Sequence, residues 1–288
     1  MRQPSDSIQS LARDLAARIR WEQELGGQGY DARKVAPIAE PAPRTARPPE
    51  GMTVPSPSTT QYRKTYPDIH RPQPEAVPRP ASIPISEEAS SAEPRDAASA
   101  LAALGAEIGE CTRCGLAGGR TRLVFGEGNP EAELVFVGEG PGRDEDLAGR
   151  PFVGAAGQLL DRIIHAMTLD RTSVYICNVV KCRPPGNRTP APEEQQTCGG
   201  FARRQLAIIR PRVVVALGAT AAQYLLDTNA PLGALRGKFH DVNGIKVMPT
   251  FHPAYLLRNP GGKRAVWDDM QMVMRYLGLT PAGGGRSG

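Results

Sequence analysis

The amino-acid sequence predicts an α/β fold, specifically a three-layer α/β/α sandwich with a central four-stranded parallel sheet, preceded by a disordered N-terminal region. Three observations support this prediction. Short apolar runs that stop at glycine, such as "ELVFVGEG" at 133–140, are typical of strands buried on both faces. Segments with helical spacing of apolar residues alternate with these runs, which favours a parallel sheet covered by helices. Residues 30–97 contain almost no periodic apolar residues.

Composition divides the 288-residue chain into four parts. Residues 1–29 predict an amphipathic helix, with Ile8, Leu11, Leu15 and Ile19 near helical spacing. Residues 30–97 are rich in Pro, Ala and Ser and predict a disordered linker, because such a stretch buries too little surface to offset its chain entropy. Residues 98–279 form the folded domain and 280–288 a flexible tail. The helix either binds a partner protein or packs on its own domain.

The predicted core elements follow one another in regular order. Helices are expected within 97–110, 154–167, 192–210, 219–227 and 263–278, and buried strands within 132–140, 173–180 and 212–218. A hairpin around Asn243 and Gly244 would supply the fourth core strand with its second arm. Pro192 suits the first position of its helix, although Gly199 and Gly200 could interrupt it. Ligands of such sheets bind beyond the carboxyl ends of the strands.

Charge and cysteine usage restrict the class of protein. No run approaches the apolar length that spans a membrane, and the N-terminus lacks the apolar core of a secretory signal, so a cytoplasmic protein without a membrane partner is expected. An odd number of cysteines, 5, argues against a disulfide framework. The net charge of +5 is compatible with a polyanionic partner, but arginines of the linker contribute to it.

Four of the cysteines suit a metal site. Cys111 and Cys114 form a C-x-x-C pair, and Cys182 and Cys198 are single cysteines that the fold could bring to it. Four thiolates suit either a [4Fe-4S] cluster or a structural zinc ion. Cys177 lies inside an apolar strand and is interpreted as a small buried hydrophobe.

Four polar or aromatic side chains lie at the predicted strand ends or in the loops that leave them. Glu139 could act as a general base, orient water or be an ordinary exposed acid, and Phe152 could stack on a flat ligand or anchor the core. Asn178 directly follows a buried strand, where an amide needs a partner, and it offers a donor and an acceptor side by side. His252 follows the last strand and could be structural or part of a site.

Taken together, these motifs resemble the uracil-DNA glycosylase superfamily, specifically its type 4 enzymes with an iron-sulfur cluster. The resemblance covers about residues 108–279. It rests on "CTRC", "VGEGPG", "GRPFVGAAGQLLD", "CNVVKCRPPGNRTP", "RVVVALG" and "FHPAYLLRNP" in this order. It implies a [4Fe-4S] cluster on Cys111, Cys114, Cys182 and Cys198. One departure is Gly140, where the family usually has alanine, and glycine is expected to leave the loop flexible and the space free.

The resemblance also implies the roles of the site residues. Phe152 would stack on uracil, Asn178 would read its O4 and N3-H edge, and His252 would donate to O2. Glu139 would position water or stabilise the sugar cation, with the backbone of Glu139 and Gly140 touching the base. Glu145 would exclude the methyl group of thymine. The predicted DNA wedge is Leu256, with Leu257 and Arg258 as neighbours.

The predicted function is that of a monomeric DNA repair glycosylase acting on uracil-containing DNA. It would flip uracil out of the helix, hydrolyse its N-glycosidic bond and leave an abasic site. The predicted phosphate contacts are Lys181, Arg183, Arg188, Arg258, Lys263 and Arg264. Alternatives are a uracil-DNA binder or covalently trapping relative without turnover, and a zinc-bearing nucleic-acid module. Covalent capture is not expected, because His240 lies in no basic insert.

Overall fold

The computed structural model describes residues 96–279. The predicted N-terminal helix (1–29), almost all of the predicted linker (30–97) and the predicted tail (280–288) lie outside the described residues. The first helix, α2 (Ala97–Ile108), begins one residue before the predicted domain boundary, and the Asp96 side chain caps it by accepting a hydrogen bond from the Ala98 N–H (3.2 Å).

The sheet contains the predicted parallel core and two further strands at its edges. Its strand order is β1-β3-β2-β4-β6-β5. The strands are β1 (Glu127–Gly128), β2 (Leu134–Gly138), β3 (Tyr175–Asn178), β4 (Val213–Leu217), β5 (His240–Val242) and β6 (Ile245–Thr250). The four central strands are parallel, whereas β1 and β5 pair antiparallel with their neighbours. The predicted four-strand core is confirmed, but the sheet has six strands. A two-residue strand such as β1 is too short to produce a periodic pattern.

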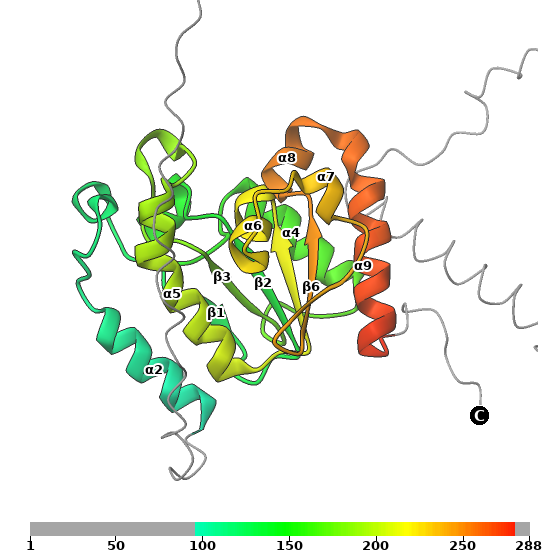
Figure 1. The fold of residues 1–288 in the computed structure, drawn as a ribbon, viewed down its shortest axis with the longest axis horizontal. Helices are drawn as coiled ribbons and strands as arrows, with labels where there is room; N and C mark the ends of the chain where they lie inside the picture. Colours follow the sequence, from blue (N-terminus) through cyan, green and yellow to red (C-terminus); the bar gives the residue numbers. More distant parts are fainter. Residues whose placement is uncertain (1–95, 280–288) are drawn as a thin grey trace, which may run out of the picture. The chain divides into compact units, whose positions relative to one another are not determined.

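Helices cover both faces of this sheet (Figure 1). The other helices are α3 (Arg143–Ala148), α4 (Ala155–Ala166), α5 (Pro192–Ile209), α6 (Ala219–Leu226), α7 (Leu232–Leu235), α8 (Pro253–Arg258) and α9 (Lys263–Leu277). Short 3-10 turns occur at η3 (Gly115–Gly119), η4 (Pro185–Asn187) and η5 (Pro260–Gly262). Helix α5 is continuous, and Gly199 serves packing, because a side chain there would collide with the ring of Tyr224. No helix among residues 96–279 is long and apolar enough to cross a bilayer.

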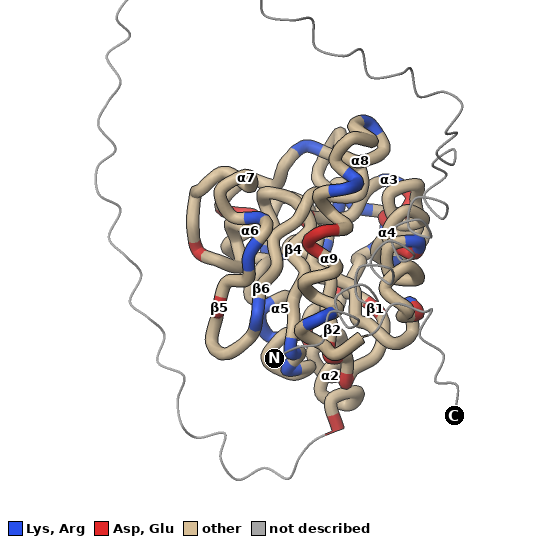
Figure 2. Tube along the Cα trace, turned by 90° about the vertical axis from the view of Figure 1, so that its right-hand side faces the viewer, with Lys and Arg blue, Asp and Glu red and all other residues tan. Residues whose placement is uncertain are grey.

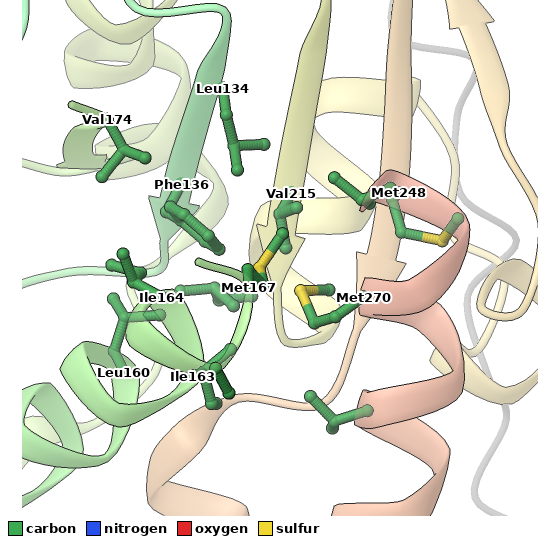
Figure 3. Close-up of a cluster of buried hydrophobic side chains, with 14 of the residues drawn as sticks. Leu134, Phe136, Leu160, Ile163, Ile164, Met167, Val174, Val215, Met248 and Met270 are labelled. Atoms are coloured by element: carbon green, nitrogen blue, oxygen red, sulfur yellow. The ribbon is translucent and has the colours of Figure 1, made fainter. Parts of the chain in front are cut away.

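Alternate residues of each strand enter two separate hydrophobic cores. Phe136 and Val215 pack with residues of α4 and α9 on one face, which Figure 3 shows in close-up. Val137 and Val214 pack with residues of α2, α5 and α6 on the other face. This period-2 division over a sheet buried on both sides produces the three layers predicted from the sequence.

The strand register brings the loops of the site together. Gly138 of β2 pairs with Asn178 of β3, and Leu217 of β4 pairs with Thr250 of β6. Because these parallel strands all end at one edge of the sheet, the segments that follow them meet there.

Candidate functional site: a cleft at the carboxyl edge of the sheet

A cleft of about 500 Å³ opens at this edge. Segments after all four parallel strands line it, as the topology predicted. Its lining includes Glu139, Gly140, Glu145, Phe152, Asn178, Thr220, His252, Tyr255 and Arg258. A cleft of this size with a few convergent polar groups is typical of a small-ligand site.

Glu139 lies directly after β2 and is held by a residue that the sequence analysis missed. The Thr220 hydroxyl donates a hydrogen bond of 2.5 Å to Glu139 Oε2. Thr220 lies in the first turn of α6, three residues after the end of β4. The polar motifs predicted from the sequence follow the other core strands only, whereas Thr220 lies in "LGAT", just after the third core strand, and the same topological rule applies to it.

Phe152 is held in an unusual backbone conformation. Its φ of 50° lies in the left-handed region, which is rare for an aromatic residue, and its ring is 5% exposed. Arg171 donates to the carbonyl oxygens of Pro151 and Phe152. Gly157 lets the main chain of Phe152 pack directly on α4, because a Cβ there would collide with the Phe152 carbonyl. Several contacts therefore fix the loop that carries the ring.

The Phe152 ring forms one wall of the cleft. It stacks on the imidazole of His252 with ring centroids 5.5 Å apart and an interplanar angle of 29°. Glycine at position 138 permits this packing, since a Cβ there would lie 2.6 Å from Phe152 Cζ and would also collide with Asn178 Oδ1. Gly138, Phe152 and Asn178 thus fit together at the end of β2.

Asn178 lines the cleft and carries a buried, unsatisfied acceptor. The residue is 1% exposed and is the last residue of β3. Its Oδ1 is one of the few buried side-chain polar atoms within residues 96–279 that have no hydrogen-bond partner. A buried acceptor costs free energy when it is left unpaired, so this atom indicates a ligand that supplies a donor.

His252 is neutral and has a defined tautomer. It is the N-cap of α8, and its Nδ1 accepts a hydrogen bond from the Ala254 N–H (3.1 Å). Burial, and then the charge of Arg258, lowers the pKa of His252 to about 4, against an opposing effect of Glu145. Because Nδ1 is the acceptor, the proton of the neutral ring lies on Nε2. The ring therefore offers one N–H donor.

Glu145 lines the cleft, but its carboxylate is engaged with the backbone. Oε1 accepts hydrogen bonds from the N–H groups of Val153 and Gly154 (both 2.9 Å), and Oε2 accepts one from Gly142 (3.1 Å). The residue joins the loop after β2 to the loop that carries Phe152. Its predicted role in excluding the thymine methyl group stays a prediction.

Gly140 does not leave free space, which corrects the expectation from the sequence. A Cβ at this position would lie 2.7 Å from Val180 Cγ2. Val180 is buried in the core on the α5 side of the sheet. Alanine at position 140 would therefore require Val180 to move, because that buried side chain already occupies the space.

The structure contradicts the prediction that Leu256 is the DNA wedge. Leu256 is 0% exposed and belongs to the hydrophobic core with α9. Pro253 and Leu256, three residues apart, share the buried side of α8, so the next residue points outward. Leu257 is 46% exposed and Tyr255 39%. Side-chain direction in this short helix depends on its packing, which the sequence did not specify.

Of the six predicted phosphate contacts, one is excluded by its burial. Lys181 is 0% exposed, so it cannot contact a phosphate, and that prediction is wrong. Arg188 is 46% exposed at its side chain but forms two hydrogen bonds with Glu194 (2.7 and 2.8 Å). Arg258 lines the cleft. Figure 2 shows Lys and Arg positions at and beside α8, where Arg258, Lys263 and Arg264 lie.

The four predicted cysteine ligands line one small cavity. Cys111, Cys114, Cys182 and Cys198 all border it, whereas Cys177 is buried in the strand β3 as predicted. Within residues 96–279, no group of three or more His, Cys, Asp or Glu side chains is gathered closely enough to hold a single metal ion. All four thiols nevertheless border one common space.

Three of these sulfur atoms accept hydrogen bonds from N–H donors. Arg113 Nη1 lies 3.4 Å from Cys111 Sγ, Arg120 Nη1 lies 3.4 Å from Cys182 Sγ, and the Lys181 N–H lies 3.2 Å from Cys198 Sγ. Burial raises the pKa of Cys198 to about 11, although Lys181 acts in the opposite direction. Donors of this kind stabilise thiolate sulfur in iron-sulfur and zinc sites.

Comparison with known proteins agrees with this geometry. The family model of the uracil DNA glycosylase superfamily matches residues 125–271. A type-4 uracil-DNA glycosylase of Thermotoga maritima is 50% identical over 174 residues, which cover 59% of this chain and 91% of the relative. The type-4 enzyme of Archaeoglobus fulgidus is 44% identical over 180 residues, 60% of this chain and 90% of the relative. A type-5 uracil-DNA glycosylase of Thermus thermophilus is 35% identical over 120 residues, 36% of this chain and 54% of the relative. The chain therefore belongs to the uracil-DNA glycosylase superfamily, with type-4 enzymes among its relatives.

Proposed function

We propose that this protein is a DNA repair enzyme that removes uracil by hydrolysing its N-glycosidic bond and leaves an abasic site. The single observation that carries the proposal is the buried, unpaired Asn178 Oδ1 in the cleft that Phe152 and His252 also line. Uracil presents an N3-H donor beside its O4 acceptor, which matches the acceptor and donor of a carboxamide. Cytosine presents the inverse pattern, so Asn178 would reject it.

The base reaches the cleft only after leaving the DNA stack, because the bond to the sugar is inaccessible inside a duplex. Unstacking costs a few kcal/mol, and apolar side chains inserted into the stack offset part of it. Leu257 and Tyr255 are the exposed apolar residues of α8, so we assign the wedge to Leu257 with Tyr255 and Arg258 beside it. The extruded uracil would then stack on Phe152.

Cleavage breaks the bond between C1′ of the sugar and N1 of uracil. The electron pair leaves with the base, and negative charge develops on its O2. A donor at that oxygen typically contributes about 3 kcal/mol. The Nε2-H of neutral His252 would be this donor, because Nδ1 is already occupied by the Ala254 N–H.

Glu139 would act on the other side of the bond. Thr220 fixes Oε2, so Oε1 is the oxygen that would orient a water molecule toward C1′ and stabilise positive charge on the sugar. The water oxygen ends on C1′, and its proton balances the charge on the departing uracil. The products are free uracil and an abasic sugar, without a covalent enzyme intermediate.

We further assign a [4Fe-4S] cluster to Cys111, Cys114, Cys182 and Cys198. The four thiols border one cavity, and four thiolates are the ligand set of such a cluster, which the resemblance of the sequence also implies. When bound, the cluster would crosslink the segments before β1 and after β3, and no reaction step would use it. Pro184, Asn187 and Arg188, which lie between two of the ligands, line the cleft.

The test is a cleavage assay on labelled oligonucleotides that contain one uracil, followed by hot alkali to break abasic sites. We expect cleavage with the wild type and loss of at least about 10²-fold with Glu139→Ala. Glu131→Ala is the matched control, because Glu131 is exposed and precedes β2 at the opposite edge of the sheet. Intact DNA with the wild type would contradict the proposal and leave a uracil-DNA binder, and DNA retained on the denatured protein would indicate covalent capture.

The cofactor has its own test. Protein purified without oxygen should be brown and contain about four iron atoms per chain, whereas a colourless protein with stoichiometric zinc would contradict the cluster. The monomeric state, the cytoplasmic location and a partner for the N-terminal helix stay predictions of the sequence.

A further inference from the structure

Lys181 is a fully buried lysine that the proposed reaction does not use. Its side chain is 0% exposed, and its ammonium group donates hydrogen bonds to the main-chain carbonyl oxygen of Asn178 (2.8 Å) and to Gln205 Oε1 (2.6 Å). Both acceptors are neutral. Burying an amino group away from water is costly, so its retention here needs a reason beyond packing.

Gln205 extends this contact into a network. The residue is 0% exposed, and its Nε2 donates to the Phe125 carbonyl oxygen (3.0 Å) and to the Tyr175 hydroxyl (3.2 Å). Tyr175 begins β3 and Asn178 ends it. The network therefore joins both ends of β3 to helix α5 and to the segment before β1.

The main chain of Lys181 is also anchored. Its N–H donates to Cys198 Sγ (3.2 Å), and its carbonyl oxygen accepts a hydrogen bond from the Val124 N–H (2.8 Å). The residue thus connects the cysteine cavity to Asn178, whose side-chain oxygen is buried without a hydrogen-bond partner at the cleft.

We propose that Lys181 is a positioning residue for base recognition, whose ammonium group fixes the main chain of Asn178 and thereby the direction of its carboxamide. The inference rests on the proposed function, because it takes Asn178 as the reader of uracil. Misplacement of a recognition group by about 1 Å can cost on the order of 10²-fold in rate. Lys181 does not line the cleft, so its effect on the base is indirect, and Asn178 is the cleft residue that its side chain contacts.

The decisive variant is Lys181→Met, which keeps an unbranched side chain one atom shorter and removes its donors. We expect free uracil, used as a product inhibitor of excision, to bind about tenfold more weakly, while the affinity for DNA that carries an abasic site stays within about twofold. A general loss of structure or of iron would weaken both. Lys246→Met is the matched control, since Lys246 is a partly exposed lysine near the start of β6, at the opposite edge of the sheet.

A double-mutant cycle with Asn178→Ala tests the route of the effect. Asn178→Ala should lower kcat/KM for uracil excision, and adding Lys181→Met should lower it little further. If Lys181→Met lowered kcat/KM equally with and without Asn178→Ala, the inference would be overturned. Equal weakening of the affinities for free uracil and for abasic DNA would also overturn it. A wild type that neither excises nor binds uracil would instead refute the proposed function.

A second variant is needed if Lys181→Met does not fold because it leaves Gln205 Oε1 buried without a donor. Lys181→Met with Gln205→Leu removes donor and acceptor together, which is better tolerated than leaving one of them buried alone. Weaker uracil inhibition in this folded, iron-loaded variant supports the inference, and unchanged inhibition overturns it. Failure of both variants to fold would also overturn it, because Lys181 would then act on the whole domain.

Discussion

The cleft at the carboxyl edge of the sheet and the cysteine cavity share the chain segment 178–198 but satisfy their polar groups in opposite ways. In the cleft, Glu139 and His252 each have one atom in a hydrogen bond within the protein, Oε2 of Glu139 and Nδ1 of His252. The buried Asn178 Oδ1 has no hydrogen-bond partner. In the cysteine cavity, three of the four sulfur atoms already accept N–H hydrogen bonds. The cleft is thus arranged for a ligand that brings its own donors, and the cavity for one that brings positive charge.

The two sites differ in the structural elements that hold their residues in place. The cleft is formed by the ends of parallel strands, so it depends on the sheet register. The cysteine cavity joins irregular segments before β1 to the segment after β3 and to α5. We therefore expect the cleft to survive single substitutions of its polar groups, and the cavity to depend on its bound cluster.

Among the substitutions that test this difference, Cys198→Ala should have the largest effect on iron content and thermal stability. Loss of one ligand should remove most of the bound iron and lower the thermal midpoint by about 10 °C or more, at roughly 2–4 °C per kcal/mol for a domain of this size. The measurements are iron content and thermal unfolding. Cys177→Ala is the control and should keep its iron, because Cys177 is buried in β3 away from the cavity. Normal iron in Cys198→Ala would remove this residue from the ligand set.

The protonation of His252 predicts an acid-dependent loss of stability that comes from the cleft. Burial, then Arg258, lowers its folded-state pKa to about 4, whereas an unfolded histidine has a pKa of about 6.5. Between these values the unfolded state binds the proton and the folded state does not, so this residue destabilises the fold increasingly as pH falls from about 6.5 to about 4. The full effect is on the order of 3 kcal/mol.

His252→Gln should abolish that pH dependence. Its free energy of unfolding, measured with urea at a series of pH values, should decrease less than that of the wild type between pH 7 and 4. Parallel curves for the two proteins would show that His252 is protonated normally and would break the assignment of a neutral Nε2-H donor.

Thr220→Val should lower kcat by about tenfold to 10²-fold and leave KM nearly unchanged. The substitution removes the hydroxyl that holds Glu139 Oε2, and a hydrogen bond to a charged group contributes about 1.5–3 kcal/mol. Single-turnover excision kinetics measure this effect. Thr220→Ser keeps the hydroxyl and should restore most of the rate; equal losses in the two variants would mean that packing, not the hydrogen bond, is responsible.

The smallest effect on catalysis is expected from Leu257→Ala. Excision from duplex DNA should decrease a few-fold and excision from single strands should not, because only the duplex has to be opened. Stability should change by no more than about 0.5 kcal/mol, since Leu257 is exposed. Leu256→Ala, in the core, should instead cost about 2–5 kcal/mol of stability. If Leu256→Ala lowered excision from duplex DNA without loss of stability and Leu257→Ala did not lower it, Leu256 would again be the candidate wedge.

Topology made much of the site predictable. Glu139 and His252 follow strands of the parallel core and Asn178 ends one, and the carboxyl ends of such strands meet at one edge. Thr220 follows the end of β4 by the same rule, but a threonine in the first turn of an apolar helix carries no polar motif of its own. Arg171 was not found at all, because its contacts with the Phe152 loop join residues about 20 positions apart, and no local pattern records them.

The sequence by itself determined the class of fold, the order of its elements and the edge at which the site forms, because apolar periodicity and strand direction are local properties of the chain. The grouping of four cysteines was implied by the resemblance of its motifs, and the structure places all four at one cavity. Only the tertiary structure decided that Leu256 is buried while Leu257 is exposed, that Lys181 contacts Asn178 instead of a phosphate, and that Val180 fills the space beside Gly140. Each of these depends on which side chains from distant segments occupy the same volume, and packing of that kind is settled only when the whole domain has folded.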